Sequence, residues 1–212
     1  MNVITKIEVQ KRNKDRVNIY INEEYAFSLS SELVYKEGLK LKQTIDIDKI
    51  KKVAKEDSYI KCKEAALRIV EKTYKTQKEI KDKLFLKGYD ENTIDRTIEF
   101  LEEYNFIDDK NYTRMYVSDK IKKQGANKIK YELTKKGVSE ELIKDQISNI
   151  DKDSEKEVAY LLAEKKYSIL KKREGDKYKL SQKLYRFLIS KGYEYDIVSE
   201  IVKKIVNNEE IY

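Results

Sequence analysis

The hexapeptide LFLKGY at residues 84–89 is the most informative part of the sequence, because it recurs as LTKKGV at 133–138 and as LISKGY at 188–193. Each copy has Leu four positions before a Gly, Lys directly before it and an apolar residue directly after it. Apolar residues also repeat eight positions before each Gly and six, ten and thirteen positions after it. They are Ile80, Ile129 and Leu184; Ile94, Ile143 and Val198; Ile98, Ile147 and Val202; and Leu101, Ile150 and Ile205. Agreement among three copies at so many positions predicts an internal structural repeat.

Each repeat is predicted to contain three helices. One helix ends at the Gly, which supplies the left-handed C-cap that a side chain resists. The helix that follows begins near Asp90, Ser139 or Glu194. A further helix precedes each pair, and the three are expected over 58–74, 109–123 and 154–174. Because such small units bury little surface alone, we expect them to stack into an elongated, curved array.

Local signals refine the helix boundaries. Thr76 followed by Glu79, and Ser154 followed by Glu157, predict capping boxes at helix starts. The third repeat is longer ahead of its Gly than the others, and extra helical turns around 165–177 are expected to absorb the difference.

The first thirty residues alternate apolar and polar residues with period two, which is typical of strands with one buried face. The apolar sets are Val3, Thr5, Ile7 and Val9; Val17, Ile19 and Ile21; and Tyr25, Phe27 and Leu29. Polar breaks at 11–15 and 22–24 predict hairpin turns, and a short helix over 31–37 is expected to end at Gly38. The predicted fold is therefore mainly α, with three tandem three-helix repeats and a small N-terminal antiparallel β meander. The expected boundaries are 1–45 for the meander and short helix, and 46–107, 108–151 and 152–212 for the repeats.

Composition excludes several classes of enzyme. The 212-residue chain has no His and one Cys, Cys62, so it lacks the side chains for a Cys/His zinc site or a His-dependent nucleophile. Its six glycines match neither dinucleotide-binding nor P-loop spacing. We therefore expect no catalytic activity, no metal and no cofactor. The sequence shows no signal peptide and no long apolar run, which predicts a soluble cytoplasmic protein without membrane contact.

Positive charge is concentrated in the middle repeat. The net charge is +7, and residues 120–136 alone contribute seven lysines against one acid, Glu132. We call these lysines the basic cluster: Lys120, Lys122, Lys123, Lys128, Lys130, Lys135 and Lys136. A solvated helical face is the alternative interpretation, but the corresponding windows of the other repeats are nearly balanced in charge. The cluster, with Arg114 nearby, is the candidate surface for phosphates or for an acidic protein partner.

Other polar and aromatic residues have structural interpretations that we favour. Asp109 is expected to cap the following helix, with Asp108 adding favourable charge, rather than to bind a metal ion. Arg96 is expected to pair with Glu99 on the helix surface, and Arg68 likewise to pair with a nearby acid. Most tyrosines are expected to pack in cores, and the three to test for DNA contact are Tyr112, Tyr116 and Tyr131.

Three motifs in order resemble a known family. ALRIV at 66–70, the repeated L-x-x-K-G segments and FIDDKNY at 106–112 look like RecX, the bacterial regulator of the RecA recombinase, and the resemblance covers roughly 58–205. It implies a non-enzymatic protein of homologous recombination, DNA repair and the SOS response, which binds RecA and its nucleoprotein filament on single-stranded DNA. By the same resemblance, it restrains filament growth, ATP hydrolysis and strand exchange. The third unit departs from the pattern, since its upstream helix is longer and Tyr195 stands where the others have Glu91 and Glu140.

A RecA-independent nucleic-acid-binding protein of helix-turn-helix type is the alternative function. Against it, the helix after each Gly has the same apolar stripe, whereas a dedicated recognition helix should differ in one copy. The helix after Gly137 has one Lys and three acids over 139–149, which suits a major groove poorly. We expect a monomer that contacts RecA and that has single-stranded DNA as a further candidate partner.

Overall fold

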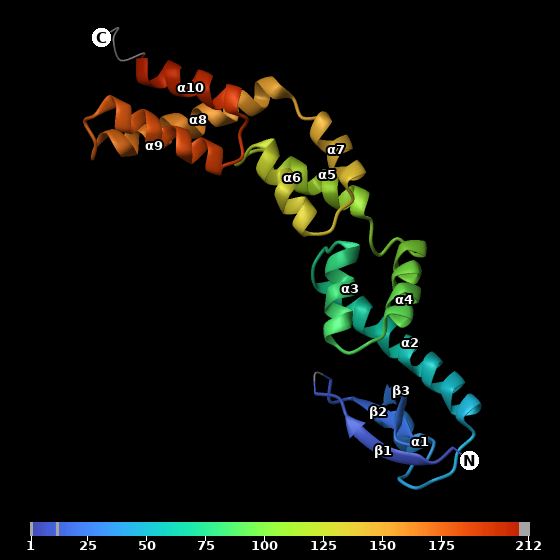
Figure 1. The fold of residues 1–212 in the computed structure, drawn as a ribbon. Helices are drawn as coiled ribbons and strands as arrows, with labels where there is room; N and C mark the ends of the chain where they lie inside the picture. Colours follow the sequence, from blue (N-terminus) through green and yellow to red (C-terminus); the bar gives the residue numbers. More distant parts are fainter. Residues whose placement is uncertain (1, 12, 208–212) are drawn as a thin grey trace. The chain divides into compact units, whose positions relative to one another are not determined.

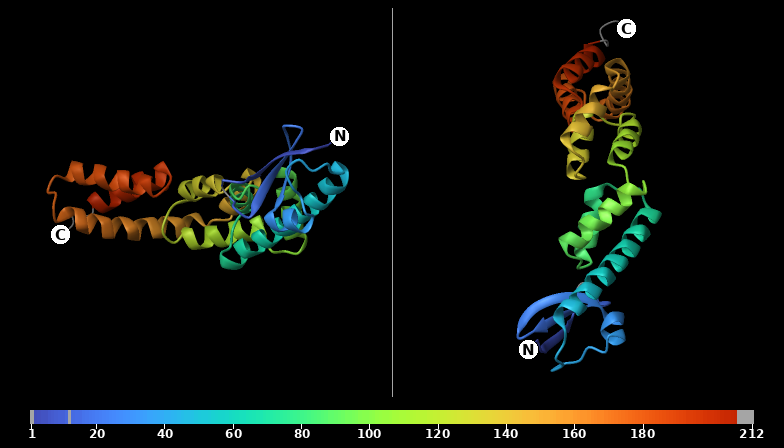
Figure 2. Two further views of the ribbon diagram at one scale, coloured as in Figure 1. Left: turned by 90° about the horizontal axis from the view of Figure 1, so that it is seen from below. Right: turned by 90° about the vertical axis from the view of Figure 1, so that its right-hand side faces the viewer.

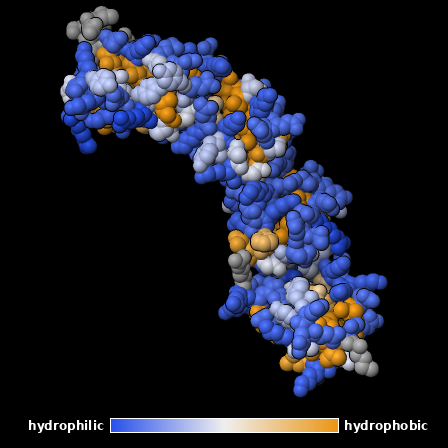
Figure 3. All heavy atoms as spheres, in the orientation of Figure 1, coloured by the Kyte–Doolittle hydropathy of each residue, from blue (hydrophilic) through white to orange (hydrophobic). Residues whose placement is uncertain are grey.

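The computed structural model describes residues 2–11 and 13–207, and the chain divides into two compact units, 1–108 and 109–212 (Figure 1). Each unit has its own apolar cores. On the face seen in Figure 3, hydrophilic residues cover most of the surface and apolar residues form scattered patches. This distribution is expected when the apolar positions of the repeats face inward.

The N-terminal meander is confirmed. Strands β1 (Ile4–Val9), β2 (Arg16–Ile21) and β3 (Glu24–Ser30) form an antiparallel sheet in the order β1-β2-β3. Asn22 and Glu23 both have positive φ, as expected for the two-residue hairpin turn that joins twisted strands. The short helix α1 (Ser31–Lys36) ends just before Gly38, which has a φ of 60°.

The buried face of β1 differs from the prediction. Ile4 is completely buried and Val9 is largely exposed, although the period-two pattern placed Val9 with Val3, Thr5 and Ile7 on one inward face. The pairing of β1 with β2 shifts register between Ile4 and Lys6. Such a bulge changes which residues face inward, so that Ile4 and Ile7 both contact the core.

Helix α2 (Ile47–Lys72) serves two cores of the first unit and is continuous through the predicted start at residue 58. Asp46 caps it, and nothing in its sequence interrupts it. Its first half buries Ile50 and Ala54 against the sheet, and its second half buries Cys62 and Ala66 against α3 (Gln77–Leu86) and α4 (Glu91–Glu103). Figure 2 shows α2 as one unbroken helix that runs from the sheet to α3 and α4.

The second unit contains two three-helix domains. The first comprises α5 (Asp109–Lys120), α6 (Ala126–Lys135) and α7 (Glu140–Ser148). The next comprises α8 (Lys152–Lys171), α9 (Lys177–Ser190) and α10 (Tyr195–Asn207). Helix α8 is longer than α5, and α9 is longer than α3 and α6, which confirms the extra turns expected in the third repeat. Three-helix domains thus follow one another along the chain, whereas an elongated, curved arrangement of the whole stays a prediction.

The repeated glycines end helices as expected. Gly88, Gly137 and Gly192 have φ values of 86°, 78° and 89°. In each copy the residue after Gly donates its N–H to the carbonyl of the repeated Leu, with N···O distances of 3.4, 3.2 and 3.3 Å. This is a Schellman C-cap, in which the apolar residue after Gly folds back onto the helix and is buried.

Two of the local predictions at helix starts need correction. The capping box of Thr76 and Glu79 is present, but the one at Ser154 and Glu157 was wrong. Asp151 caps α8 instead, and the Ser154 hydroxyl donates to its carboxylate at 2.7 Å. Helix α5 begins at Asp109, the first residue of the expected range, so Asp109 lies in the first turn of the helix rather than at the N-cap position before it.

Candidate partner-binding surface

The basic cluster lies along α5, the following turn and α6 of the second three-helix domain. Lys120 is the last residue of α5, Lys122 and Lys123 lie in the turn, and the other lysines lie on α6 or, for Lys136, at its C-cap. The turn is closed by backbone hydrogen bonds from Lys123 and Gln124 to the Lys120 carbonyl, at 2.9 and 3.0 Å. Lys122, Lys123, Lys130 and Lys135 are exposed, whereas Lys120, Lys128 and Lys136 are partly buried.

The turn that carries these lysines is docked on the third three-helix domain. Gly125 caps α6 and donates its N–H to the Lys191 carbonyl at 2.9 Å, and Asn127 donates to the Gly192 carbonyl at 3.1 Å. A Cβ atom on Gly125 would lie 2.5 Å from backbone atoms of Gly192 and Tyr193. The position therefore requires glycine, and the close backbone contact holds the lysine turn in place.

Buried Glu155 of α8 completes this contact between the two domains. Its carboxylate accepts a hydrogen bond from the Ala126 N–H at 2.8 Å, and Ala126 is the first residue of α6. An unpaired N–H at a helix start needs such an acceptor. Burial raises the pKa of Glu155, although the hydrogen bond from Ala126 opposes this effect.

Tyrosine rings lie beside the partly buried lysines. Tyr112 and Tyr116 stack with centroids 5.9 Å apart, and the Lys136 Nζ lies 5.7 Å from each ring centroid. Lys120 Nζ lies 5.3 Å from the Tyr116 centroid. These distances lie within the range of cation–π interactions, which hold the two lysines near the aromatic pair. Tyr112, a candidate for DNA contact, is buried and not available for stacking on a base, whereas Tyr131 is 59% exposed and remains available.

Glu132, the single acid of the segment, organises this region. Its carboxylate accepts hydrogen bonds from the Tyr116 hydroxyl at 2.8 Å and from Gln124 Nε2 at 2.7 Å. Burial opposes ionisation of Glu132, but the two hydrogen bonds and the charges of Lys128 and Lys120 outweigh it and hold the Glu132 pKa below its ordinary value. Burial and the bond to Glu132 raise the pKa of Tyr116. The sequence alone gave no indication that Glu132 and Gln124 act together.

Two predicted residues lie apart from the tyrosine pair. Lys130 is two positions from Lys128, about 200° around the α6 axis, and its Nζ lies 3.9 Å from Glu140 of α7. Arg114 is two positions from Tyr116, so it lies on the opposite side of α5, and it donates to Asn111 Oδ1 at 2.9 Å. The structure therefore places Lys120, Lys135 and Lys136 beside tyrosine rings and leaves Lys130 and Arg114 on other faces.

The remaining candidates have structural roles. Arg96 pairs with Glu56 at 3.0 Å and stacks on Tyr59 at 3.7 Å, so its predicted partner Glu99 was wrong, although an intramolecular pair was expected. Burial raises the pKa of the Cys62 thiol to about 11, which disfavours a reactive thiolate. Within the described residues, no group of acids and Cys is placed to hold a metal ion, and no described helix is long and apolar enough to cross a membrane.

Comparison with known proteins accounts for nearly the whole chain. The regulatory protein RecX N-terminal domain matches residues 2–46, and the first, second and third three-helix domains of RecX match 62–101, 108–145 and 153–202. Relatives named regulatory protein RecX include that of Clostridium perfringens strain 13, which is 57% identical over 209 residues and 99% of both chains. Another, from Clostridioides difficile strain 630, is 39% identical over 99% of both.

Solved structures agree with these matches. A crystal structure of regulatory protein RecX has a TM-score of 0.65 and 26% identity, and the match covers 98% of this chain and 100% of the other. RecX from Lactobacillus salivarius has a TM-score of 0.63 and 28% identity, covering 71% of this chain and 97% of the other. By its domain order, its sequence and its fold, the chain belongs to the RecX family of regulatory proteins.

Proposed function

We propose that this protein binds RecA, or the RecA filament on single-stranded DNA, and restrains filament growth, ATP hydrolysis and strand exchange. It acts by binding as a monomer in the cytoplasm and catalyses no reaction itself. The observation that carries this proposal is the match of the RecX N-terminal domain and all three RecX three-helix domains in order. The absence of His and the inert, buried Cys62 support a binding role rather than catalysis.

The basic cluster is the contact surface in this proposal. Lys122, Lys123 and Lys135 are exposed, and Tyr131 beside Lys135 adds an exposed ring at 4.6 Å from its ammonium group. Ammonium groups with a neighbouring ring suit either an acidic strip on RecA or the phosphates and bases of single-stranded DNA. The contacts of Gly125 and Glu155 keep the lysines on a fixed turn, so little ordering is required on binding.

The decisive measurement is ATP hydrolysis by RecA on single-stranded DNA at increasing ratios of this protein. We expect inhibition at substoichiometric to stoichiometric ratios. Unchanged hydrolysis would contradict the proposal. If DNA binding were retained in that case, the RecA-independent nucleic-acid-binding function would be supported instead.

Charge reversal tests the role of the cluster. The triple variant Lys122→Glu, Lys123→Glu and Lys135→Glu changes exposed residues and leaves the packed Lys128 and the Glu140-facing Lys130 intact. We expect the half-inhibiting concentration to rise about tenfold or more, because several cation–anion contacts become repulsive. The matched control reverses three exposed lysines of the third domain: Lys165, Lys172 and Lys203. If the two triple variants behave alike, the cluster is a solvated face.

A further inference from the structure

Arg16, on β2 of the N-terminal sheet, is buried without matching hydrogen bonds. Its side chain is 2% exposed, and its Nε and Nη1 atoms have no hydrogen-bond partner among the described residues. The guanidinium lies over the ring of Tyr89, 4.7 Å from the centroid. An arginine remains charged at neutral pH, and a buried charge without acceptors is unfavourable. Among the described residues, the fold therefore lacks acceptors for Nε and Nη1.

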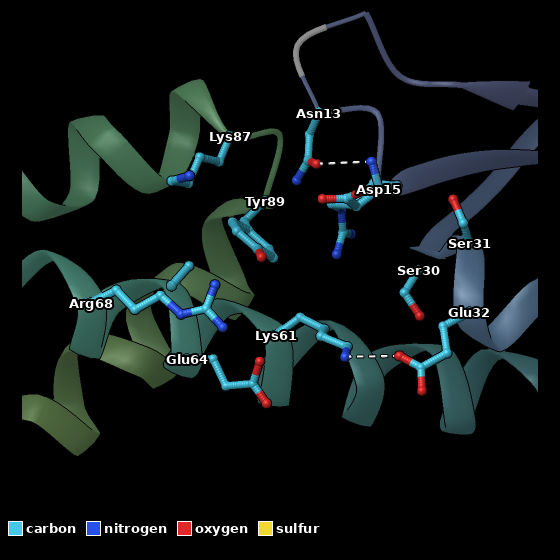
Figure 4. A pocket seen from close by; sticks show the side chains of 12 residues that line it. Asn13, Asp15, Ser30, Ser31, Glu32, Lys61, Glu64, Arg68, Lys87 and Tyr89 are labelled. Atoms are coloured by element: carbon cyan, nitrogen blue, oxygen red, sulfur yellow. Dashed lines mark hydrogen bonds and ion pairs between the residues drawn. The ribbon is translucent and has the colours of Figure 1, made fainter.

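Arg16 lines a cavity of about 370 Å³ within the first unit. Figure 4 shows Tyr89, Lys87 and Arg68 on one side of it and Ser30, Ser31 and Glu32 on another. Its walls come from the hairpin loop before β2, the start of α1, α2 and the turn after α3. A cavity of this size accommodates a small ligand or a single side chain.

The acids near the cavity do not supply the missing acceptor. Glu32 accepts from Lys61 Nζ at 3.0 Å, and Asp57 of α2 accepts from the N–H and hydroxyl of Ser30, both at 3.0 Å. Asp15 and Glu64 also line the cavity, but no hydrogen bond joins either carboxylate to Arg16 Nε or Nη1. Gln10 Oε1, which borders the adjoining space with Arg16, is likewise partnerless and uncharged.

The balance of charge indicates the kind of ligand. Four cationic residues line the cavity, Arg16, Lys61, Arg68 and Lys87, against the three acids Asp15, Glu32 and Glu64. One singly charged carboxylate would neutralise this excess. A phosphate dianion or a nucleic-acid backbone would bring more negative charge than this excess neutralises, and the three acids would repel it. Guanidinium groups also match carboxylate geometry well.

We propose that the Arg16 cavity binds one carboxylate group, either a free small carboxylate or an acidic side chain of a bound protein segment. Arg16 holds the group from within, Tyr89 fixes the plane of the guanidinium, and Lys87 and Arg68 attract the group at the mouth. This site is separate from the basic cluster, and its test requires neither RecA nor DNA.

The test is NMR of the full chain with labelled arginine side chains, which is feasible because the chain has seven arginines. Sodium acetate is titrated against sodium chloride at equal ionic strength. We expect a saturable shift of the Arg16 Nε–H signal with acetate and none with chloride. Arg96 serves as the internal control, since it also stacks on a tyrosine but is exposed and already paired with Glu56.

Variants and probes make the outcome specific. Arg16→Lys keeps the charge but removes Nε–H, and Lys87→Glu changes an exposed residue without touching Arg16. We expect about tenfold weaker acetate binding in each, as for loss of a charge-assisted hydrogen bond or of a nearby cation. Because Arg16→Lys has no Nε–H signal, acetate binding to the variants and to the original protein is compared through the backbone amide signal of Tyr89, which lines the cavity. The peptide acetyl-Ala-Glu-Ala-amide and its Gln counterpart distinguish the two sources. Binding of the Glu peptide identifies a protein carboxylate, and binding of acetate alone identifies a small molecule.

Several results would overturn the proposal. One is an Arg16 signal that responds equally to acetate and chloride, and another is one that responds more strongly to inorganic phosphate than to acetate. A third is an Arg16 Nε–H signal that is shifted by the substitution Gln10→Ala but not by acetate. Gln10 Oε1 would then be the hydrogen-bond acceptor of Arg16.

Discussion

At the scale of single residues, Glu155 links stability to pH. Its pKa is raised in the folded protein, chiefly by burial, so the folded state holds this proton more tightly than the unfolded chain. The resulting stabilisation is fully present below the unfolded pKa of about 4.3. It is lost as pH rises through the folded pKa. We therefore expect the stability of the protein, relative to Glu155→Gln, to fall as pH rises from 4 to neutral, in urea unfolding at a series of pH values.

A second variant separates charge from hydrogen bonding at this position. Glu155→Gln keeps an acceptor for the Ala126 N–H, whereas Glu155→Ala removes it. We expect the alanine variant to lose about 1–3 kcal/mol at neutral pH, because a buried N–H is left without a partner. If alanine and glutamine behaved alike, the hydrogen bond to α6 would contribute nothing.

Tyr131 tests base stacking at a single side chain. The ring is 59% exposed and lies beside Lys135. If it stacks on a base, Tyr131→Ala should weaken binding to single-stranded DNA by about 1–3 kcal/mol. Tyr178 of α9, 71% exposed and outside the basic cluster, is the matched control. Fluorescence anisotropy with a labelled oligonucleotide measures both, and equal effects would contradict a specific role for Tyr131.

At the scale of helices and turns, Gly125 tests the contact between the second and third three-helix domains. Its φ of −80° suits any residue, so only the close approach to Gly192 and Tyr193 requires glycine. We expect Gly125→Ala to destabilise the protein by about 1–3 kcal/mol in urea unfolding, as for other overpacked sites. Gly175→Ala is the control, because a Cβ there meets nothing within 4 Å. Equal stability of the two variants would show that the domains shift apart without cost.

The sequence predicted the helix ends and turns whose structure is decided by neighbouring residues. The Gly caps and the Thr76 capping box depend on neighbouring residues, and both are present. The bulge in β1 depends on pairing with β2, so it was not evident from residue periodicity. Ser154 failed as a cap because Asp151, an equally good N-cap, lies one turn earlier.

The candidate sites also divide into those that neighbouring residues reveal and those that only the folded chain brings together. The lysines of the basic cluster are adjacent in sequence and could be found by counting charge. The contacts of Glu132 with Tyr116 and of Glu155 with Ala126 join residues 16 and 29 positions apart, and no sequence spacing marks them. Arg16 and Tyr89 are still farther apart, and only their packing brings them together.

At the scale of the whole molecule, the distribution of charge distinguishes binding to DNA from binding to RecA. Nearly all of the net +7 comes from residues 120–136, so DNA binding should depend on this one segment. If about five of its lysines contact phosphates of single-stranded DNA, the slope of log K against log salt concentration should be about −3.5. The triple reversal at Lys122, Lys123 and Lys135 should reduce the slope to about −1.4, and the control reversal in the third domain should leave it unchanged. Salt-independent DNA binding would exclude phosphate contacts. A third outcome is that the protein inhibits RecA but does not bind DNA by itself. If the triple variant then lost the inhibition, the lysines would be assigned to contact with an acidic surface of RecA.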